Sequence, residues 1–254
     1  MSRRPVRSFT LSGSAHKKSR SSPLLSVGLV LLGAFLLIGY SYRNSGGEGG
    51  GGAVSRKELS GISGGGSCTL DVQQAIPALK AAYGESMSKV LHVGPETCSV
   101  VSKFLKEDIE ALGVEPYDLE EADSGCKSLV RKGIVRVADI KFPLPYREKS
   151  FSLVIVSDAL DYLSPKYVNK TLLDLTRVST DGLVVFTGYP GQQKVTAADQ
   201  SKFGRLAKLR SPSWWVKYFA QTGLEVNEDF AKKFEKASSK QSYKPNCQIF
   251  HLSS

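Results

Sequence analysis

Residues 135–163 read VRVADIKFPLPYREKSFSLVIVSDALDYL, and this stretch decides the fold. It predicts an apolar strand that ends near Asp139, a loop punctuated by prolines, and a second apolar strand that ends before Asp158. Apolar runs of this kind are typical of parallel strands that are buried on both faces. Because open α/β sheets bind ligands at the carboxyl ends of their strands, the stretch predicts a nucleotide-like pocket beside Asp139 and Asp158.

The sequence before this stretch has the same alternation of strands and helices. Residues 89–93 form a short apolar run that Gly94 ends, and residues 99–112 carry apolar side chains at helical spacing. A second strand is predicted at 113–118, which places the acid Glu115 about twenty residues beyond the turn, where ribose-binding acids lie.

The sequence after it completes the pattern. We expect a helix over residues 167–178 and a buried strand that enters through the turn 180–182 and runs to Gly188. Ser211 can cap a further helix, and residues 248–252 form a last strand.

The order of parts over residues 85–190 resembles the class I S-adenosylmethionine-dependent methyltransferases. The resemblance implies a Rossmann-like α/β fold with a mostly parallel seven-stranded sheet flanked by helices, and S-adenosylmethionine as the cofactor. The family's first loop has several glycines, whereas this chain has Gly94 alone, followed by Pro95 and Glu96. The glycine-poor loop leaves open a weak enzyme or a pseudoenzyme.

Alignment by position with this family implies roles for individual residues. Gly94 would let the backbone approach the cofactor, Glu115 would bind the ribose hydroxyls, and Asp139 would accept a hydrogen bond from the adenine amino group. Asp158 and Tyr189 would border the site of methyl transfer as its catalytic residues. Asp118 and Tyr162 are the respective alternatives to Glu115 and Tyr189, and His92 is expected to be packed in its strand rather than catalytic.

The N-terminus predicts a membrane anchor. Residues 24–40 carry no charge and follow a tail with six basic residues, which the positive-inside tendency keeps in the cytosol. The run exceeds the apolar core of a signal peptide, and no Ala-x-Ala site follows it. We therefore expect a cytosolic tail at 1–22, a signal anchor at 23–42, a Gly/Ser-rich stem at 43–66 and a luminal domain at 67–254.

A luminal domain can form disulfides and can be glycosylated. Cys68, Cys98, Cys126 and Cys247 are candidates for disulfides of undetermined pairing, and their spacing does not fit a zinc site. Asn169 begins the sequon Asn-Lys-Thr on a predicted outer helix. No metal site is expected.

Charge indicates the class of acceptor. The formal net charge is +10, with basic residues gathered in the tail and late in the chain. Lys202, Arg205 and Lys208, at three-residue spacing, are candidates for binding a polyanion, although a solvated basic face is the simpler interpretation. A luminal domain does not meet nucleic acid, so we expect an anionic polysaccharide.

The whole chain resembles the plant Cotton Golgi-related proteins. The residues that carry this likeness are the basic tail with the anchor, and residues 93–97, 113–118 and 138–145. The resemblance implies residence in the Golgi membrane as a single-pass type II protein, homogalacturonan pectin as the acceptor, and other pectin-synthesising Golgi enzymes as partners.

These observations predict a carboxyl methyltransferase that methyl-esterifies pectin galacturonate. The ionised carboxylate is itself the nucleophile, so the enzyme needs to orient it and exclude water rather than supply a base. Two alternatives stay open: a non-catalytic partner of a pectin methyltransferase, and a pectin methylesterase that hydrolyses the same ester. The esterases of this kind are parallel β-helices, which need short repeated strands instead of alternating strands and helices.

Overall fold

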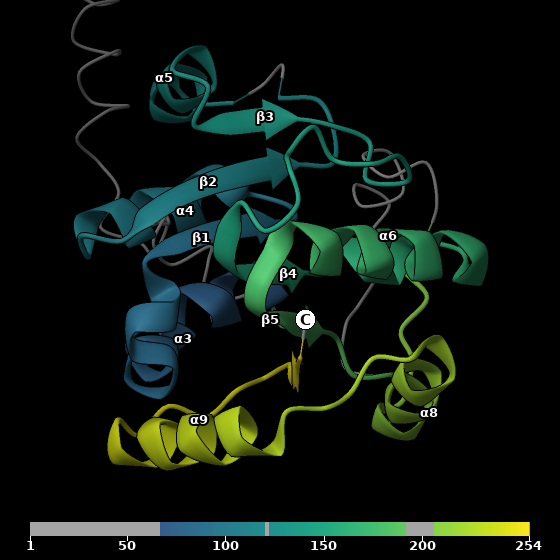
Figure 1. The fold of residues 1–254 in the computed structure, drawn as a ribbon. Coiled ribbons are helices and arrows are strands. Elements are labelled where there is room, and N and C mark those ends of the chain that lie inside the picture. The colour runs from purple at the N-terminus through teal and green to yellow at the C-terminus, as the bar shows by residue number, and fades with distance from the viewer. Residues whose placement is uncertain (1–66, 120–121, 192–205, 254) are drawn as a thin grey trace, which may run out of the picture. The chain divides into compact units, whose positions relative to one another are not determined.

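The computed structural model describes residues 67–119, 122–191 and 206–253. Their centre is a six-stranded sheet in the order β3-β2-β1-β4-β5-β6 (Figure 1). The strands β1 to β5 run parallel, and β6 runs antiparallel to β5. The strands are β1 (Lys89–Val93), β2 (Glu110–Glu115), β3 (Val135–Val137), β4 (Phe151–Ser157), β5 (Ser179–Thr187) and β6 (Gln248–Leu252). This is the doubly wound order of Rossmann-like folds, which confirms the predicted α/β class.

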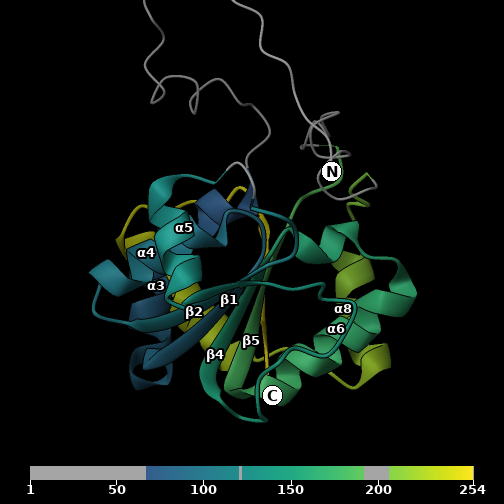
Figure 2. The ribbon, with the colours of Figure 1, turned by 90° about the horizontal axis from the view of Figure 1, so that it is seen from above.

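Helices cover both faces of the sheet (Figure 2). One face packs against α3 (Cys68–Tyr83), α4 (Thr97–Lys106), α5 (Ser124–Arg131) and α9 (Glu228–Lys240). The other packs against α6 (Pro165–Val178) and α8 (Pro212–Thr222). Two short 3-10 helices connect larger elements: η1 (Gly84–Met87) lies between α3 and β1, and η2 (Ala159–Tyr162) lies between β4 and α6.

Burial on both faces explains the continuous apolar strands. In β1, Val90 belongs to the core on the α3 side, whereas Leu91 belongs to the core on the α6 side. In β4, Leu153 and Val154 divide between the two cores in the same way. Each fully buried side chain of this size contributes roughly 1.5–3 kcal/mol relative to exposure, so a strand buried on both faces has no polar side to alternate.

The helix predicted over residues 99–112 is wrong at its end. The helix α4 stops at Lys106, Asp108 has a φ of 57°, and β2 begins at Glu110. Ile109 and Leu112 fit the helical spacing in the sequence, but Ile109 lies just before β2 and Leu112 is the third residue of that strand. A left-handed residue cannot continue an α-helix, so the chain turns there.

Two predictions about the far side of the sheet also need correction. Residues 180–182 are part of β5 rather than a turn before it. The described residues contain six sheet strands instead of the predicted seven. At the outer edge of β6, the segment between α8 and α9 pairs with the strand by one isolated bridge, between Val226 and Leu252.

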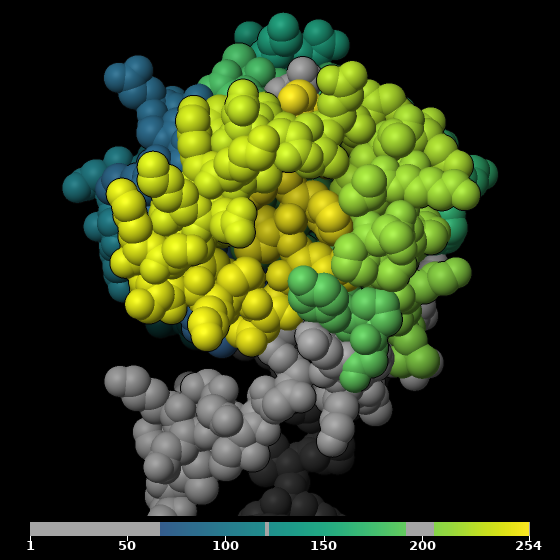
Figure 3. All heavy atoms as spheres, turned by 90° about the horizontal axis from the view of Figure 1, so that it is seen from below, coloured from purple at the N-terminus to yellow at the C-terminus, as the bar shows by residue number. Residues whose placement is uncertain are grey.

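The last strand lies recessed in the surface. Figure 3 shows β6 at the bottom of a hollow between α9 and α8. The predicted helix after Ser211 and the last strand at Gln248–Leu252 are both confirmed, and the Ser211 hydroxyl accepts from the Trp214 N–H as the helix cap. Recession of an edge strand between helices protects it from pairing with another chain.

Two disulfides join elements that are distant in sequence. Cys68 at the start of α3 is bonded to Cys247 just before β6, and Cys98 in the first turn of α4 is bonded to Cys126 in α5. Both bonds lie near the carboxyl edge of the parallel strands, because α3 and α4 begin there and β6 enters the sheet there. The structure thus resolves the pairing that the sequence left open.

The predicted tail, anchor and stem lie outside the described residues. Among residues 67–119, 122–191 and 206–253, no helix is long and apolar enough to cross a membrane. The predicted polyanion-binding residues Lys202 and Arg205 also fall outside the described parts.

Candidate functional site

A pocket of about 320 Å³ opens at the carboxyl edge of the sheet. It is lined by the loops that follow β2, β3 and β4 and by the start of α6: Pro116, Tyr117, Asp139, Ile140, Lys141, Ala159, Tyr162, Leu163, Ser164 and Tyr167. It lies beside Asp139, as residues 135–163 predict, whereas Asp158 is not among its lining residues. Its volume is in the range of small-molecule sites. Its wall combines apolar side chains such as Ile140 and Leu163 with charged ones such as Asp139 and Lys141.

Asp139 lies in this pocket, two residues beyond the end of β3. One carboxylate oxygen accepts from the backbone N–H of Lys141 at 3.0 Å, and the other pairs with the Lys141 ammonium at 2.9 Å. The ammonium also lies 5.9 Å from the centre of the Tyr167 ring. The structure therefore adds a cation to the pocket that the sequence analysis missed, although Lys141 follows Asp139 by only two positions.

Glu115 is the last residue of β2 but does not line the pocket. Its side chain is 1% exposed, and its carboxylate accepts from the backbone N–H of Thr97 at 3.1 Å. Thr97 is the first residue of α4, so the carboxylate lies at the positive end of that helix. A Cβ on Gly113 would lie 2.7 Å from the Thr97 hydroxyl, so the glycine in β2 allows this close approach.

Tyr117 extends from the loop after β2 into the same region. Burial raises the pKa of its phenol well above the ordinary value, and the carboxylates of Glu115 and Asp158 raise it further. The phenol therefore stays protonated and lies among acids that come from β2 and from the end of β4. Tyr117 was not predicted as a site residue, yet its position in the loop two residues beyond Glu115, the last residue of β2, is a usable signal.

Gly94 serves the packing of two strands. A Cβ at this position would lie 2.5 Å from the carbonyl oxygen of Ser157 at the end of β4. The next residues turn into α4 with Glu96 in the left-handed region, at a φ of 54°. The loop thus closes without further glycines, and Gly94 is needed at least for contact between β1 and β4.

A buried chain of hydroxyls and one imidazole connects these strands. The ring nitrogens of His92 lie 2.7 Å from the Thr97 hydroxyl and 3.1 Å from the Ser157 hydroxyl. The Ser157 hydroxyl lies 3.1 Å from that of Thr69, which donates to the carbonyl of Pro95. Burial lowers the pKa of His92 to about 3, so the ring is neutral and packed, as expected.

Asp158 follows β4 directly and has a φ of 56°. One of its carboxylate oxygens accepts from the Ser67 hydroxyl at 2.9 Å and from the backbone N–H of Thr69 at 3.2 Å. The carboxylate therefore caps α3, and its catalytic role stays a prediction. Tyr189, the second predicted catalytic residue, lies half-buried two residues beyond β5 and is not among the lining residues of the pocket.

A buried acid that the sequence analysis missed lies behind the pocket. Asp161 in η2 accepts from the Thr187 hydroxyl at 2.6 Å and from the Gly188 N–H at 3.2 Å, and it lies 3.9 Å from the Arg210 guanidinium. Burial raises the pKa of Asp161 to about 7, while the hydroxyl, the N–H and Arg210 act against this rise. These contacts hold η2, which carries the lining residue Tyr162.

The Asp161 backbone carbonyl also accepts from the N–H of Lys208 at 2.7 Å. Lys208 is exposed, and it is the one predicted polyanion-binding residue that the structure describes. Its backbone lies against η2, which borders the pocket.

The sequon lies on α6, as predicted. Asn169 is half-buried, and the hydroxyl of Thr171 donates to the carbonyl of Ile140 at 2.7 Å. Use of this sequon stays a prediction. Within the described ranges, no group of three or more His, Cys, Asp or Glu side chains could hold a metal ion.

A scan against protein-family models finds no match. Solved structures of similar shape include an O-methyltransferase (NcsB1) from neocarzinostatin biosynthesis in complex with S-adenosyl-L-homocysteine, at 16% identity over 73% of this chain and 55% of that one, with a TM-score of 0.47. Another is an S-adenosylmethionine-dependent methyltransferase from Mesorhizobium loti, at 14% identity over 70% and 96% of the chains, with a TM-score of 0.46. Similarity at this level assigns no activity to the chain.

Two curated relatives are much closer in sequence. The "probable pectin methylesterase CGR3" of Arabidopsis thaliana is 65% identical over 99% of this chain and 98% of its own length. The "probable pectin methylesterase CGR2" of the same plant is 65% identical over 96% of this chain and 92% of its own length. The chain therefore belongs to the family of plant Cotton Golgi-related proteins that contains CGR2 and CGR3.

Proposed function

We propose that the protein is an S-adenosylmethionine-dependent methyltransferase that methyl-esterifies the galacturonate carboxylates of homogalacturonan in the Golgi. The observation that carries the proposal is the pocket at the carboxyl edge of a Rossmann-like sheet, with Asp139 in its wall. Parallel sheets of this order bind nucleotide-like ligands at this edge. The names of CGR2 and CGR3 support pectin as the polymer concerned.

The pocket residues fit the adenosine part of this cofactor. Ile140 and Leu163 offer apolar surface to a base, and the Asp139 carboxylate offers an acceptor to its amino group. The carboxylates of Glu115 and Asp158 lie further along the edge, and their negative charge suits a cationic sulfonium. Glu115 and Asp158 also hold the starts of α4 and α3, so the cofactor would meet carboxylates whose positions are already set.

The chemistry places few demands on this chain. When bound, S-adenosylmethionine supplies a methyl group on positively charged sulfur, and transfer to a carboxylate forms a methyl ester without release of a proton. The protein therefore has to bind, orient and dehydrate the acceptor. A neutral His92 and a protonated Tyr117 are consistent with a site that needs no general base.

Disulfides and basic residues support the proposed location and acceptor. Two disulfides suit an oxidising compartment such as the Golgi lumen, which a type II anchor at residues 23–42 would provide. Lys208, whose backbone lies next to η2, would bind the polyanion beside the pocket. The predicted contribution of Lys202 and Arg205 rests on their sequence spacing alone. Other pectin-synthesising enzymes of the Golgi membrane are the partners this location provides.

Calorimetric titration of S-adenosylmethionine into the full-length protein in mild detergent tests the proposal. We expect saturable binding that Asp139→Ala weakens strongly, while Asp229→Ala, an exposed acid on α9, leaves it unchanged. Transfer of a labelled methyl group to polygalacturonate should follow the same order. Absence of binding in the unsubstituted protein would overturn the methyltransferase and favour the non-catalytic partner.

Ester hydrolysis is a second candidate, because the relatives are named methylesterases and the Ser157 hydroxyl lies 3.1 Å from a His92 ring nitrogen. A serine next to a histidine is the pair that serine esterases use. Both side chains are fully buried here, and the low pKa of His92 makes it a poor base. Methanol release from methylated pectin that Ser157→Ala abolishes would establish hydrolysis instead.

A further inference from the structure

The loop between β3 and β4 forms one wall of the pocket but has little regular structure of its own. Residues 139–141 line the pocket, and the loop then continues through Pro143 and Pro145. Prolines lack an N–H, and each disfavours helical backbone in the residue before it. Leu144, between the prolines, has the single backbone N–H available over residues 143–145, so other elements have to hold the loop.

One face of α6 provides these contacts. Thr171, Asp174 and Arg177 are spaced three residues apart and therefore lie along one side of the helix. The Thr171 hydroxyl donates to the carbonyl of Ile140 at 2.7 Å, and the Asp174 carboxylate accepts from the N–H of Leu144 at 2.6 Å.

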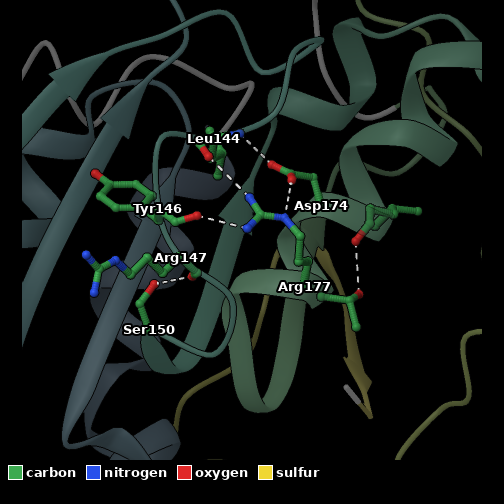
Figure 4. A network of polar contacts seen from close by, with 8 residues as sticks. Leu144, Tyr146, Arg147, Ser150, Asp174 and Arg177 are labelled. Carbon is green, nitrogen blue, oxygen red and sulfur yellow. Dashed lines mark hydrogen bonds and ion pairs between the residues drawn. The ribbon is translucent and has the colours of Figure 1, made fainter.

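Arg177 completes the attachment (Figure 4). Its guanidinium donates to the carbonyl of Tyr146 at 2.8 Å, to the carbonyl of Leu144 at 3.2 Å and to the Asp174 carboxylate at 2.8 Å. The side chains of Arg177 and Asp174 are 30% and 13% exposed, so solvent screens the pair only in part. A planar guanidinium holds its N–H donors in a rigid fork, a geometry that an ammonium on a flexible stem does not reproduce.

We propose that Asp174 and Arg177 are positioning residues for the cofactor pocket, acting through residues 139–141. They hold the loop at Leu144 and Tyr146, and the loop in turn sets where the Asp139 carboxylate and the Ile140 backbone stand in the pocket wall. This inference rests on the proposed function, because it assigns the contacts of Asp174 and Arg177 with the loop, here called the clamp, to the site that the proposal gives to S-adenosylmethionine. Loss of the clamp should weaken ligand binding more than it weakens the fold.

The test compares full-length protein with the variants Arg177→Ala, Arg177→Lys and Asp174→Asn. Titration with S-adenosylhomocysteine should show a Kd raised about tenfold in Arg177→Ala, which corresponds to a loss of about 1.4 kcal/mol of binding free energy. Hydrogen exchange should show faster exchange at the Leu144 and Phe142 amides, with the β1 and β4 amides unchanged. Lys232→Ala, which removes an exposed ion pair on α9, is the matched control and should change neither quantity.

Arg177→Lys keeps the charge but loses the fork, so it tests the geometry even if Arg177→Ala does not fold. A cycle with Asp139→Ala tests the route: if Arg177 acts through Asp139, its substitution costs less affinity in the Asp139→Ala background. An unchanged Kd in both Arg177 variants, with binding in the unsubstituted protein, would overturn the clamp and leave the proposed function standing. No binding in the unsubstituted protein would overturn both.

Discussion

Single acids at the carboxyl edge of the sheet differ in what they hold. Asp139 is half-exposed in the pocket, whereas Glu115 and Asp158 are buried and accept from backbone amides in the first turns of α4 and α3. The sequence analysis assigned all three to ligand or substrate. Burial and hydrogen bonding now separate one carboxylate that a ligand can reach directly from two that also organise the helices around it.

The Lys141 ammonium is expected to weaken cofactor binding. It pairs with Asp139 at 2.9 Å and adds positive charge to a pocket proposed for a sulfonium. We expect Lys141→Met to lower the Kd for S-adenosylmethionine about two- to fivefold, the range of an exposed ion pair. Calorimetry checks this, and S-adenosylhomocysteine, which lacks the sulfonium charge, should gain less. A raised Kd would instead make Lys141 a ligand-binding residue.

Gly94→Ala should destabilise the fold whether or not a cofactor binds. The added Cβ would lie 2.5 Å from the Ser157 carbonyl, which belongs to a buried strand and has little room to move. We expect the free energy of unfolding to fall by about 1–3 kcal/mol, the usual cost of overpacking. Urea unfolding without ligand measures it. Gly125→Ala, whose added Cβ would meet only the Asp123 side chain, should have a much smaller effect.

His92 should make the domain less stable in acid. The pKa of the ring is about 3 in the folded protein and near 6.5 when unfolded, so below pH 6.5 only the unfolded chain takes up this proton. Stability is therefore lost as pH falls from 6.5 towards 3, by up to about 1.4 kcal/mol per pH unit. Urea unfolding at several pH values should show a shallower loss in His92→Gln. His251, with a pKa lowered to about 4, keeps part of the slope.

At the scale of elements, the starts of α3 and α4 meet the ends of β1, β2 and β4. The Thr69 hydroxyl of α3 donates to the carbonyl of Pro95, two residues after β1, and the Thr97 amide of α4 donates to Glu115. Each helix start is also joined by a disulfide to a more distant element. The candidate site is thus framed by two helix N-termini that covalent bonds keep in place.

The two disulfides should differ in their effect on stability. The Cys68–Cys247 bond spans 179 residues and the Cys98–Cys126 bond 28 residues. Loop-closure entropy favours the longer loop, at about 5 kcal/mol against about 4 kcal/mol. Paired Cys→Ala variants, compared by urea unfolding, should show the larger loss for the Cys68 and Cys247 pair. The reverse order would mean that the unfolded chain keeps α3 near β6 without the bond.

At the scale of the whole molecule, charge and topology point to different ligands for different surfaces. The sheet order brings acids to one edge, while the chain as a whole carries a net charge of +10. A cation fits the edge, and a polyanion fits the basic excess.

Binding of polygalacturonate should therefore depend on salt. The distance over which exposed charges interact, the Debye length, shortens from about 30 Å at low salt to about 10 Å near physiological salt. We expect the Kd for polygalacturonate to rise steeply with salt and the Kd for S-adenosylmethionine to rise less, as measured by calorimetry on the full-length protein. Fully methyl-esterified pectin, which lacks the carboxylate charge, is the control. Equal binding of both polymers would exclude charge as the basis of recognition.

The sequence was a good guide to elements whose pattern is local. The strands β1 and β6 match their predicted ranges, and the helix after Ser211 begins at its predicted cap. The misjudged end of α4 lies where one apolar series crosses from helix to strand, because Ile109 and Leu112 fit both periods. Local spacing cannot decide such a case, since burial against the neighbouring strands is what selects the strand.

Sequence alone determined the α/β class, the place of the pocket and the presence of Asp139 in it, because alternation, proline punctuation and chain order are local or topological properties. Tertiary structure alone decided the disulfide pairing, the neutral His92, the Lys141 partner of Asp139 and the clamp from Asp174 and Arg177. Each of these depends on which distant side chains share a small volume and on how much water is excluded there. That information appears only when the chain has packed.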